Sequence, residues 1–254
     1  MQQVKIGVQL EPQATTTEAL RRAWTGADEL GLDTAYVWDH FYPLHGDPDA
    51  AHFEAYALLA AMAVETSRIR FGALVTCNSY RNPNLLADMS RTIDHLSGGR
   101  FILGIGSGWF ERDYTEYGYT FGTAIGRLRK LEADLPVIQQ RLSVLNPGPV
   151  GPMPVLIGGS GEKVTLRLVA EHADAWNAFG PPDNFAHKNR VLNEWCERVG
   201  RDPREIHRTV LIRPHELGTW RDYVEAGAQE LIVSLEDPFP LDGVAELLRE
   251  VRAA

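Results

Sequence analysis

Short apolar runs alternate with segments of helical apolar spacing along the whole chain. The first run, Val4–Leu10, is typical of a buried strand, and the segment after it repeats apolar residues every three or four positions until Gly31. The same alternation continues to the end of the sequence. It predicts eight strands, at residues 4–10, 34–39, 68–77, 100–108, 155–159, 174–180, 207–214 and 230–236. It predicts helices between and after them, the longest at residues 124–145 and the last at 240–254.

Eight strands that alternate with helices indicate parallel pairing through right-handed crossovers. The count and the length of 254 residues fit a closed (β/α)₈ TIM barrel, compact and with few insertions. The Pro- and Gly-rich run 146–154 leads only into the next strand, so we expect one domain over residues 1–254. A doubly wound open sheet is the competing fold, although it more often has fewer strands and a terminal glycine fingerprint.

The second strand runs directly into two ionisable residues, Asp39 and His40. In a (β/α)₈ barrel the carboxyl ends of the strands face the active site, which places both residues at its rim. Histidine titrates near neutrality, so the pair is a candidate for binding a ligand or moving a proton. The alternative is an aspartate that caps the next loop beside a surface histidine.

The fourth strand ends in alternating glycines, Gly104, Gly106 and Gly108, followed by Trp109 and Phe110. Glycines there let a flat ligand approach the backbone, and aromatic side chains can stack on it. Barrel packing alone would also explain any single glycine. The spacing differs from the G-x-G-x-x-G of dinucleotide-binding folds, and the segment lies in the middle of the chain.

The fifth strand leads into a Gly-Gly-Ser-Gly turn, Gly158 to Gly161, just before a helix. Free backbone N–H groups at the start of a helix bind anions, and Lys163 would add positive charge. The turn is therefore a candidate phosphate site, with an ordinary glycine-rich turn as the alternative.

Composition and charge exclude several classes of protein. The formal net charge of −9 argues against nucleic acid as a partner. No apolar run approaches the roughly 20 residues that span a membrane, and the N-terminus lacks the features of a signal peptide, so we expect a cytoplasmic protein. Cys77 and Cys196 lie far apart without metal-ligand spacing, and Cys77 is expected to be a buried thiol. A metal site of Asp39, His40 and His45, as in a barrel hydrolase, is a minor alternative.

Four ordered motifs together resemble the luciferase-like monooxygenase superfamily, and especially its actinobacterial branch of deazaflavin (coenzyme F420)-dependent oxidoreductases. They are WDHF, RIRFGALVTCNSYRNP, LSGGRFILGIGSGWFERDYTEYGY and VLIGGSGEKVTLRLVAEHADAWN. The resemblance implies a barrel of the bacterial luciferase type that holds a flavin or deazaflavin ring at its mouth. It also implies a bulge with a non-proline cis peptide within residues 73–75 of the third strand.

The resemblance assigns roles to particular residues. His40 matches a histidine proposed as the proton donor in relatives that oxidise sugar phosphates. Expected cofactor contacts come from the ends of strands two to five and lie at Asp39, His40, Leu74, Val75, Thr76, Ser107, Gly108, Arg112, Gly159, Ser160, Gly161 and Lys163. Basic candidates for the oligoglutamate tail of F420 are Lys163, Arg167 and Lys188.

Two positions depart from the sugar-phosphate branch. Trp109 stands where those relatives carry a carboxylate, and Arg112 replaces an asparagine ligand, which argues against sugar-phosphate oxidation. Trp109 and Phe110 instead suggest an apolar wall for a small ring-bearing or aliphatic substrate. The expected activity is hydride transfer between F420 and this substrate, in a homodimer. FMN-dependent monooxygenation and a non-catalytic flavin-binding paralogue are the alternatives.

Overall fold

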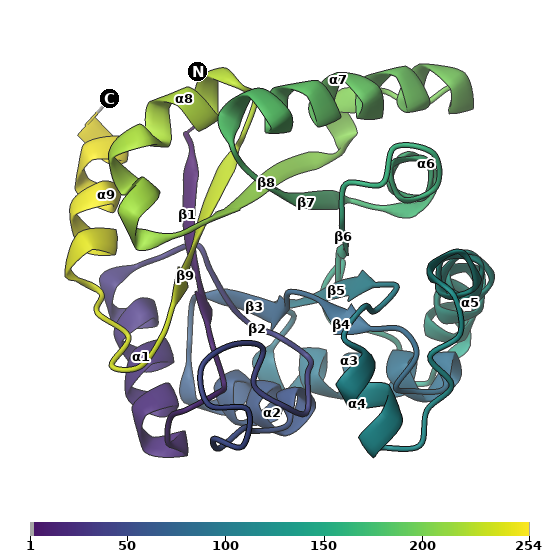
Figure 1. Cartoon of the computed structure of the whole chain (residues 1–254), viewed down its shortest axis with the longest axis horizontal. Helices are drawn as coiled ribbons and strands as arrows, with labels where there is room; N and C mark the ends of the chain where they lie inside the picture. Colours follow the sequence, from purple (N-terminus) through teal and green to yellow (C-terminus); the bar gives the residue numbers. More distant parts are fainter. Residues whose placement is uncertain (1–2, 254) are drawn as a thin grey trace.

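The chain folds into a closed barrel of parallel strands with helices around it (Figure 1). The structure is a computed structural model that describes residues 3–253, so the ends of the expected domain and of the last helix, residues 1–2 and 254, lie outside it. The strands are β1 Lys5–Leu10, β2 Thr34–Val37, β3 Arg70–Ala73, β4 Thr76–Cys77, β5 Phe101–Gly106, β6 Val155–Gly158, β7 Ala175–Phe179, β8 His207–Ile212 and β9 Glu230–Leu235.

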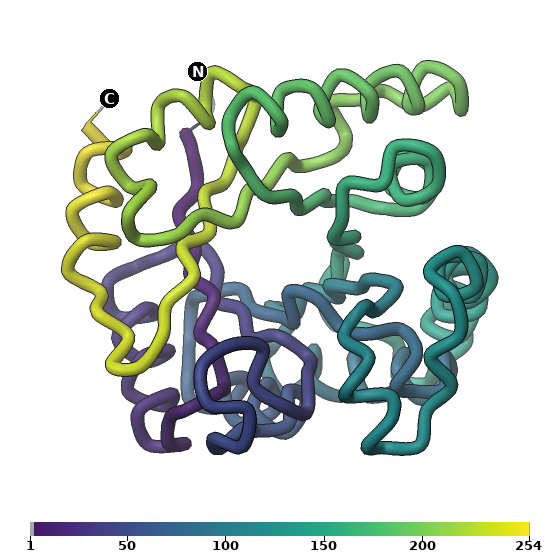
Figure 2. Tube along the Cα trace, in the orientation of Figure 1, coloured from purple at the N-terminus to yellow at the C-terminus, as the bar shows by residue number. Residues whose placement is uncertain are grey.

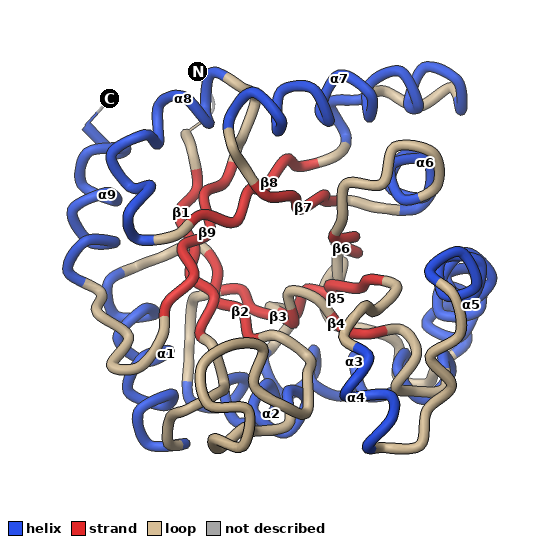
Figure 3. The backbone as a smooth tube through the Cα atoms, in the orientation of Figure 1, coloured by secondary structure: helices blue, strands red, loops and turns tan. Residues whose placement is uncertain are grey.

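Helices follow most of these strands and form the outer layer, which Figure 3 separates by colour from the inner ring of strands. The α-helices are α1 Thr17–Leu30, α2 Ala55–Glu65, α3 Pro83–Ser97, α4 Glu111–Glu116, α5 Ala124–Val144, α6 Thr165–His172, α7 Pro182–Val199, α8 Trp220–Glu225 and α9 Asp242–Ala253. Two 3₁₀ segments, η1 Pro203–Glu205 and η2 Pro214–Thr219, complete the set. Between residues 3 and 253, no helix has both the length and the apolar character needed to cross a membrane.

Every strand pairs in parallel with its neighbours, and the ring closes on itself. β1 pairs with both β2 and β9, so the first and last strands lie side by side. Both β3 and β4 pair with β5, through Phe71 opposite Phe101 and Thr76 opposite Ile105, and these pairings complete the ring. The tube in Figure 2 follows this closed path from the N-terminal to the C-terminal colours. The (β/α)₈ barrel is therefore confirmed, and the open sheet is excluded.

The third predicted strand, residues 68–77, is wrong as one continuous element. It forms two short strands, β3 and β4, which are separated at Leu74–Val75 by a non-proline cis peptide bond. The expected cis peptide within residues 73–75 is thus confirmed. The carbonyl of Leu74 accepts a hydrogen bond of 2.6 Å from the Gln9 amide on β1, so the interrupted segment is tied across the barrel.

Two apolar cores pack against the strands of the barrel, and a third, small cluster lies around Cys77, Tyr80 and Tyr114. The larger core lies between strands and helices, where Trp24 of α1 and Trp176 of β7 have no exposed surface. The smaller core fills the barrel interior with side chains from successive strands around the ring and from the break between β3 and β4: Tyr36, Leu74, Ile102, Leu156, Ala175, Leu211 and Ile232. This filled interior is typical of TIM barrels and forms the floor beneath the rim.

Candidate functional site

A cavity of about 450 Å³ lies at the carboxyl ends of the strands. Its size is within the range of cofactor and substrate sites. Nine of the expected cofactor and substrate residues line it: Asp39, His40, Leu74, Val75, Thr76, Ser107, Gly108, Trp109 and Gly159. Segments far apart in the sequence are therefore brought to one cavity. Four further candidates, Phe110, Ser160, Gly161 and Lys163, are not part of the lining, and neither is Arg112.

His40 is held by a buried carboxylate that sequence reasoning missed. Its Nδ1 lies 2.7 Å from Oδ2 of Asp113, a residue with no exposed surface at the start of α4. An ionised carboxylate only accepts hydrogen bonds, so Nδ1 carries the ring proton and Nε2 keeps its lone pair. His40 therefore presents a proton acceptor to a ligand in the cavity, or a donor once it is protonated.

Asp113 is fixed from several sides. Its Oδ1 accepts the backbone N–H groups of Phe41 and Tyr42, at 3.1 and 3.2 Å, which also anchors the loop after β2. The hydroxyl of Tyr80 donates to Oδ2 at 2.8 Å. Burial, and the negative charge of Asp113 beside it, raise the pKa of Tyr80, so this hydroxyl remains a donor. The sequence contained one signal for Asp113, an acidic residue just after the glycine-rich end of the fourth strand.

Asp39 has a different setting from the one expected. Its carboxylate has no exposed surface and forms two hydrogen bonds with the guanidinium of Arg81, at 2.6 and 3.0 Å. The backbone N–H of Cys77 donates to the same carboxylate at 3.0 Å. Asp39 thus joins the end of β2 to the end of β4, and a ligand in the cavity meets a carboxylate that is already neutralised.

The wall behind the cavity is tightly packed around Cys77 and Gly108. Gly108 has φ of +81°, and a β-carbon there would lie 2.1 Å from the Tyr114 hydroxyl and 2.5 Å from the Cys77 sulfur. Burial raises the pKa of Cys77, which keeps it a thiol, as expected from the sequence. The Thr76 hydroxyl is bonded to the Tyr56 hydroxyl at 2.9 Å.

A second histidine, His52, lies behind the cavity lining. The indole N–H of Trp38, which lines the cavity, donates to Nε2 of His52 at 3.0 Å. Burial, followed by the nearby charge of His40, lowers the pKa of His52 to about 4. His52 is therefore neutral at pH 7 and can accept this bond.

The phosphate site was predicted in the turn from β6 to α6. Gly159 reaches the cavity, but its N–H donates to the carbonyl of Asn177 at 3.0 Å and is already used. The N-cap residue of α6, Val164, makes no side-chain capping bond. In the described part of the chain, no side chain caps this end of α6, and the N–H of Leu166 in its first turn donates to the carbonyl of Gly161 at 3.0 Å.

The expected basic groups around this turn differ in their availability. Arg167 is paired with Glu132 and Glu171, at 2.7 and 2.8 Å. Lys188 is paired with Glu162 at 2.6 Å. Within residues 3–253, no ion pair involves Lys163, which leaves it the most available of the three cations.

The aromatic wall and Arg112 occupy separate places. The ring centroids of Trp109 and Phe110 lie 5.8 and 5.7 Å from that of His40, and Trp109 is 62% exposed. Arg112 points to the loop after β2, where it donates to the carbonyl of Pro48 at 2.6 Å and the carboxylate of Asp49 at 3.0 Å. These contacts explain why Arg112 does not reach the cavity.

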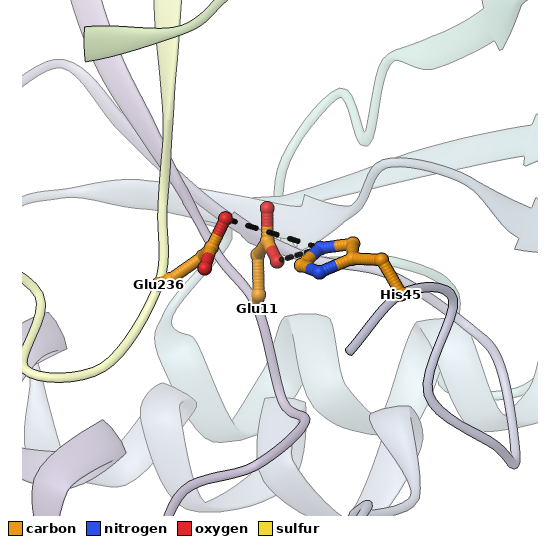
Figure 4. A group of neighbouring side chains, drawn as sticks. All are labelled: Glu11, His45 and Glu236. Carbon is orange, nitrogen blue, oxygen red and sulfur yellow. Dashed lines mark hydrogen bonds and ion pairs between the residues drawn. The ribbon is translucent and has the colours of Figure 1, made fainter. Parts of the chain in front are cut away.

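The alternative of a metal site at Asp39, His40 and His45 is not supported, because among the described residues these three do not form a group of close ligand atoms and each has another partner. Asp39 binds Arg81 and His40 binds Asp113, whereas Nε2 of His45 lies 2.8 Å from Oε2 of Glu11. Figure 4 shows His45 with Glu11 and Glu236 at the rim.

Comparisons with known proteins give a family model, related sequences and a shared fold. A family model described as luciferase-like monooxygenase matches residues 3–132. An uncharacterized protein of Mycobacterium tuberculosis is 28% identical over 88% of this chain and 89% of its own length. An F420-dependent glucose-6-phosphate dehydrogenase of Amycolatopsis mediterranei is 25% identical over 87% of this chain and 77% of its own. The solved structure of an F420-dependent secondary alcohol dehydrogenase with an F420–acetone adduct superposes with a TM-score of 0.86 at 15% identity and covers 98% of both chains.

Proposed function

The chain belongs to the luciferase-like monooxygenase family, whose members include F420- and flavin-dependent oxidoreductases, and we propose that it transfers a hydride between F420 and a small organic substrate. The observation that carries the proposal is the His40–Asp113 pair in a rim cavity of cofactor size. F420, when bound, exchanges the hydride, whereas FMN in the same place would support oxygenation. F420 is preferred because three relatives with 25–28% identity carry names that describe them as F420-dependent.

The residues of this chain fit such a cofactor. Leu74 and Val75 line the cavity at the break between β3 and β4, and Ser107 and Gly108 line it just after β5. These groups would hold a flat ring by contact with side chains and backbone. The uncapped start of α6 and the unpaired Lys163 would hold the anionic side chain, with Gly159, Ser160 and Gly161 in the turn between.

His40 would accept or donate the proton that accompanies the hydride. Asp113 keeps the lone pair on Nε2, and Asp39 fixes the backbone next to His40 through Arg81. Trp109 and Phe110 make edge-to-face contacts with the imidazole. The predicted apolar substrate would lie against Trp109.

A titration tests the proposal. The purified chain is titrated with F420 and with FMN, and binding is followed by fluorescence quenching. We expect saturable F420 binding and weaker FMN binding. Tight FMN binding without F420 binding would favour the monooxygenase alternative, and binding of neither would refute the oxidoreductase assignment. Binding without turnover on a broad panel of alcohols, carbonyls and enones would favour the non-catalytic paralogue.

We also propose one domain over residues 1–254 and a homodimer. All strands belong to one barrel, which supports the proposal of a single domain.

Three large apolar side chains are exposed on the packed pair α2 and α3, namely Val64 at 63%, Leu85 at 54% and Leu96 at 49%. A second copy would cover this face. Light scattering after chromatography should give a dimer for the wild type and a monomer for Leu85→Glu. The cytoplasmic location stays a prediction.

A further inference from the structure

A second polar cluster lies at the rim, around a buried carboxylate next to the end of β1. Glu11, just after β1, has no exposed surface. Its Oε1 accepts hydrogen bonds from Arg213 Nη1 at 2.6 Å and from the Ser234 hydroxyl at 2.8 Å, and its Oε2 lies 2.8 Å from His45 Nε2. Glu11 therefore anchors two rim residues, Arg213 and His45, and both line the main cavity.

Arg213 keeps a free edge of its guanidinium. Nη1 donates to Glu11 and to Ser234, which accounts for both of its hydrogens. Nε and Nη2 carry three further N–H groups, and in the part of the chain that the structure covers they have no hydrogen-bond partner. The side chain is 43% exposed. The Nε–Nη2 edge is the edge that binds a carboxylate through two parallel hydrogen bonds.

We propose that Arg213 binds a carboxylate group of the substrate, while Glu11 and Ser234 hold the guanidinium in place. The carbon skeleton of the substrate would lie on the apolar lining between Arg213 and Trp109, which includes Leu44, Phe179 and Leu211. This inference rests on the proposed function and narrows its substrate to organic acids with an apolar body. A planar anion uses the free edge better than a neutral carbonyl does, since both of its oxygens accept.

A metal ion is the competing occupant of this cluster. Within residues 3–253, Glu11, His45 and Glu236 form the one group whose ligand atoms all lie within 4.8 Å of one another (Figure 4). Two contacts oppose a metal ion. The guanidinium of Arg213 already neutralises Glu11. The Gln13 amide accepts from the Leu44 N–H through Oε1, so its Nε2 is a donor, and it lies 3.1 Å from Nε2 and 3.2 Å from Nδ1 of His45. Because Nε2 of His45 already faces the Glu11 carboxylate, Nδ1 is the nitrogen that accepts from Gln13, whereas a metal-bound histidine normally donates from its second nitrogen.

Two probes of the same shape test the proposal, cyclohexanecarboxylate and cyclohexanecarboxamide. Their binding to the purified chain is measured by calorimetry and ligand-observed NMR, with and without the cofactor and in the presence of EDTA. We expect the carboxylate to bind about 10- to 100-fold more tightly than the amide, as a charged, two-point hydrogen bond requires. Arg213→Lys keeps a positive charge beside Glu11 but loses the planar edge, and should remove most of this preference. Arg213→Gln should remove all of it.

The control is Arg22→Gln, which changes an exposed arginine of α1 that pairs with Glu18. It should leave the preference unchanged. Equal affinity of the wild type for both probes, or an unchanged preference in both Arg213 variants, would overturn the proposal. Stoichiometric Zn²⁺ binding without EDTA that is lost in Glu236→Gln would overturn it in favour of a metal. Weaker F420 binding in Arg213→Lys with an intact preference would assign Arg213 to the cofactor instead. Because the probes need no redox step, failure of the cofactor titration and failure of this test are separate results.

Discussion

Replacing Asp113 with asparagine should switch the tautomer of His40 without changing the shape of the site. Oδ1 of Asp113 accepts two backbone N–H groups, so the amide oxygen of asparagine should take that place. The NH₂ group then faces His40 Nδ1, and because it can only donate, Nδ1 must become the acceptor. The ring proton moves to Nε2, and the cavity meets an N–H in place of a lone pair.

The expected loss of rate follows from the role of His40. General acid–base catalysis contributes about 10²- to 10⁴-fold, so the proton-coupled step should slow by that factor in Asp113→Asn. Loss of a charged hydrogen bond in a buried site should also lower the free energy of unfolding by about 1–3 kcal/mol. Cofactor affinity should stay at the wild-type value, since Asp113 does not line the cavity.

Three measurements check this prediction. Stopped-flow single turnover follows the cofactor absorbance, ¹⁵N NMR of labelled histidine reports the tautomer of His40, and urea unfolding gives the stability. Asp28→Asn is the matched control, because Asp28 is also a buried carboxylate that accepts backbone N–H groups, from Ser67, Arg68 and Ile69, but lies at the other end of the barrel. An unchanged tautomer would refute the hydrogen-bond argument. A switched tautomer with a wild-type rate would show that His40 does not transfer the proton.

Four further changes test the same site. His40→Ala should slow turnover sharply and leave F420 affinity near the wild-type value; a collapse of affinity in the titration would make His40 a binding residue instead. Gly108→Ala should lower the free energy of urea unfolding by about 3 kcal/mol, because the added carbon would overlap the Tyr114 hydroxyl at a positive φ, and wild-type stability would contradict this packing. Burial lowers the pKa of His52 to about 4, so as the pH falls below 6.5 this histidine takes up a proton in the unfolded chain before it does so in the folded chain. The free energy of unfolding of the wild type should therefore drop by roughly 3 kcal/mol towards pH 4. The same urea titrations on His52→Gln should show a smaller drop. Trp109→Ala should raise the KM for an apolar substrate without loss of stability, since Trp109 is 62% exposed, and an unchanged KM would remove it from the substrate wall.

Periodicity was sufficient to predict the barrel, because each strand and helix buries a distinct pattern of residues. The ends of α1 and α3 could be predicted as well, since Gly31 and Gly98 adopt the left-handed conformation that ends a helix. The break at Leu74–Val75 has no periodic signal, because both residues are apolar and fit a continuous strand. It was expected only from the resemblance to a family.

The contacts of charged side chains were the least predictable part. Asp39 and His40 were expected to act together, but each is bound to a residue from another segment, Arg81 and Asp113. Such pairs depend on how loops approach one another at the rim, which local spacing does not encode. Arg112 was placed in the site only by the resemblance to a family, and its actual partners lie in the loop after β2. Glu11, Gln9 and Arg213 carried no motif at all.

The side chains that fill the barrel interior affect the order of events during a catalytic cycle. Tyr36, Leu156 and Ile232 are fully or almost fully buried below the cavity, so molecules arrive and depart by way of the rim. Two reactants that enter through the same cavity opening bind in sequence, and the one that binds deeper must enter first and leave last. Product-inhibition patterns with a deep-seated cofactor should then be those of a compulsory-order mechanism.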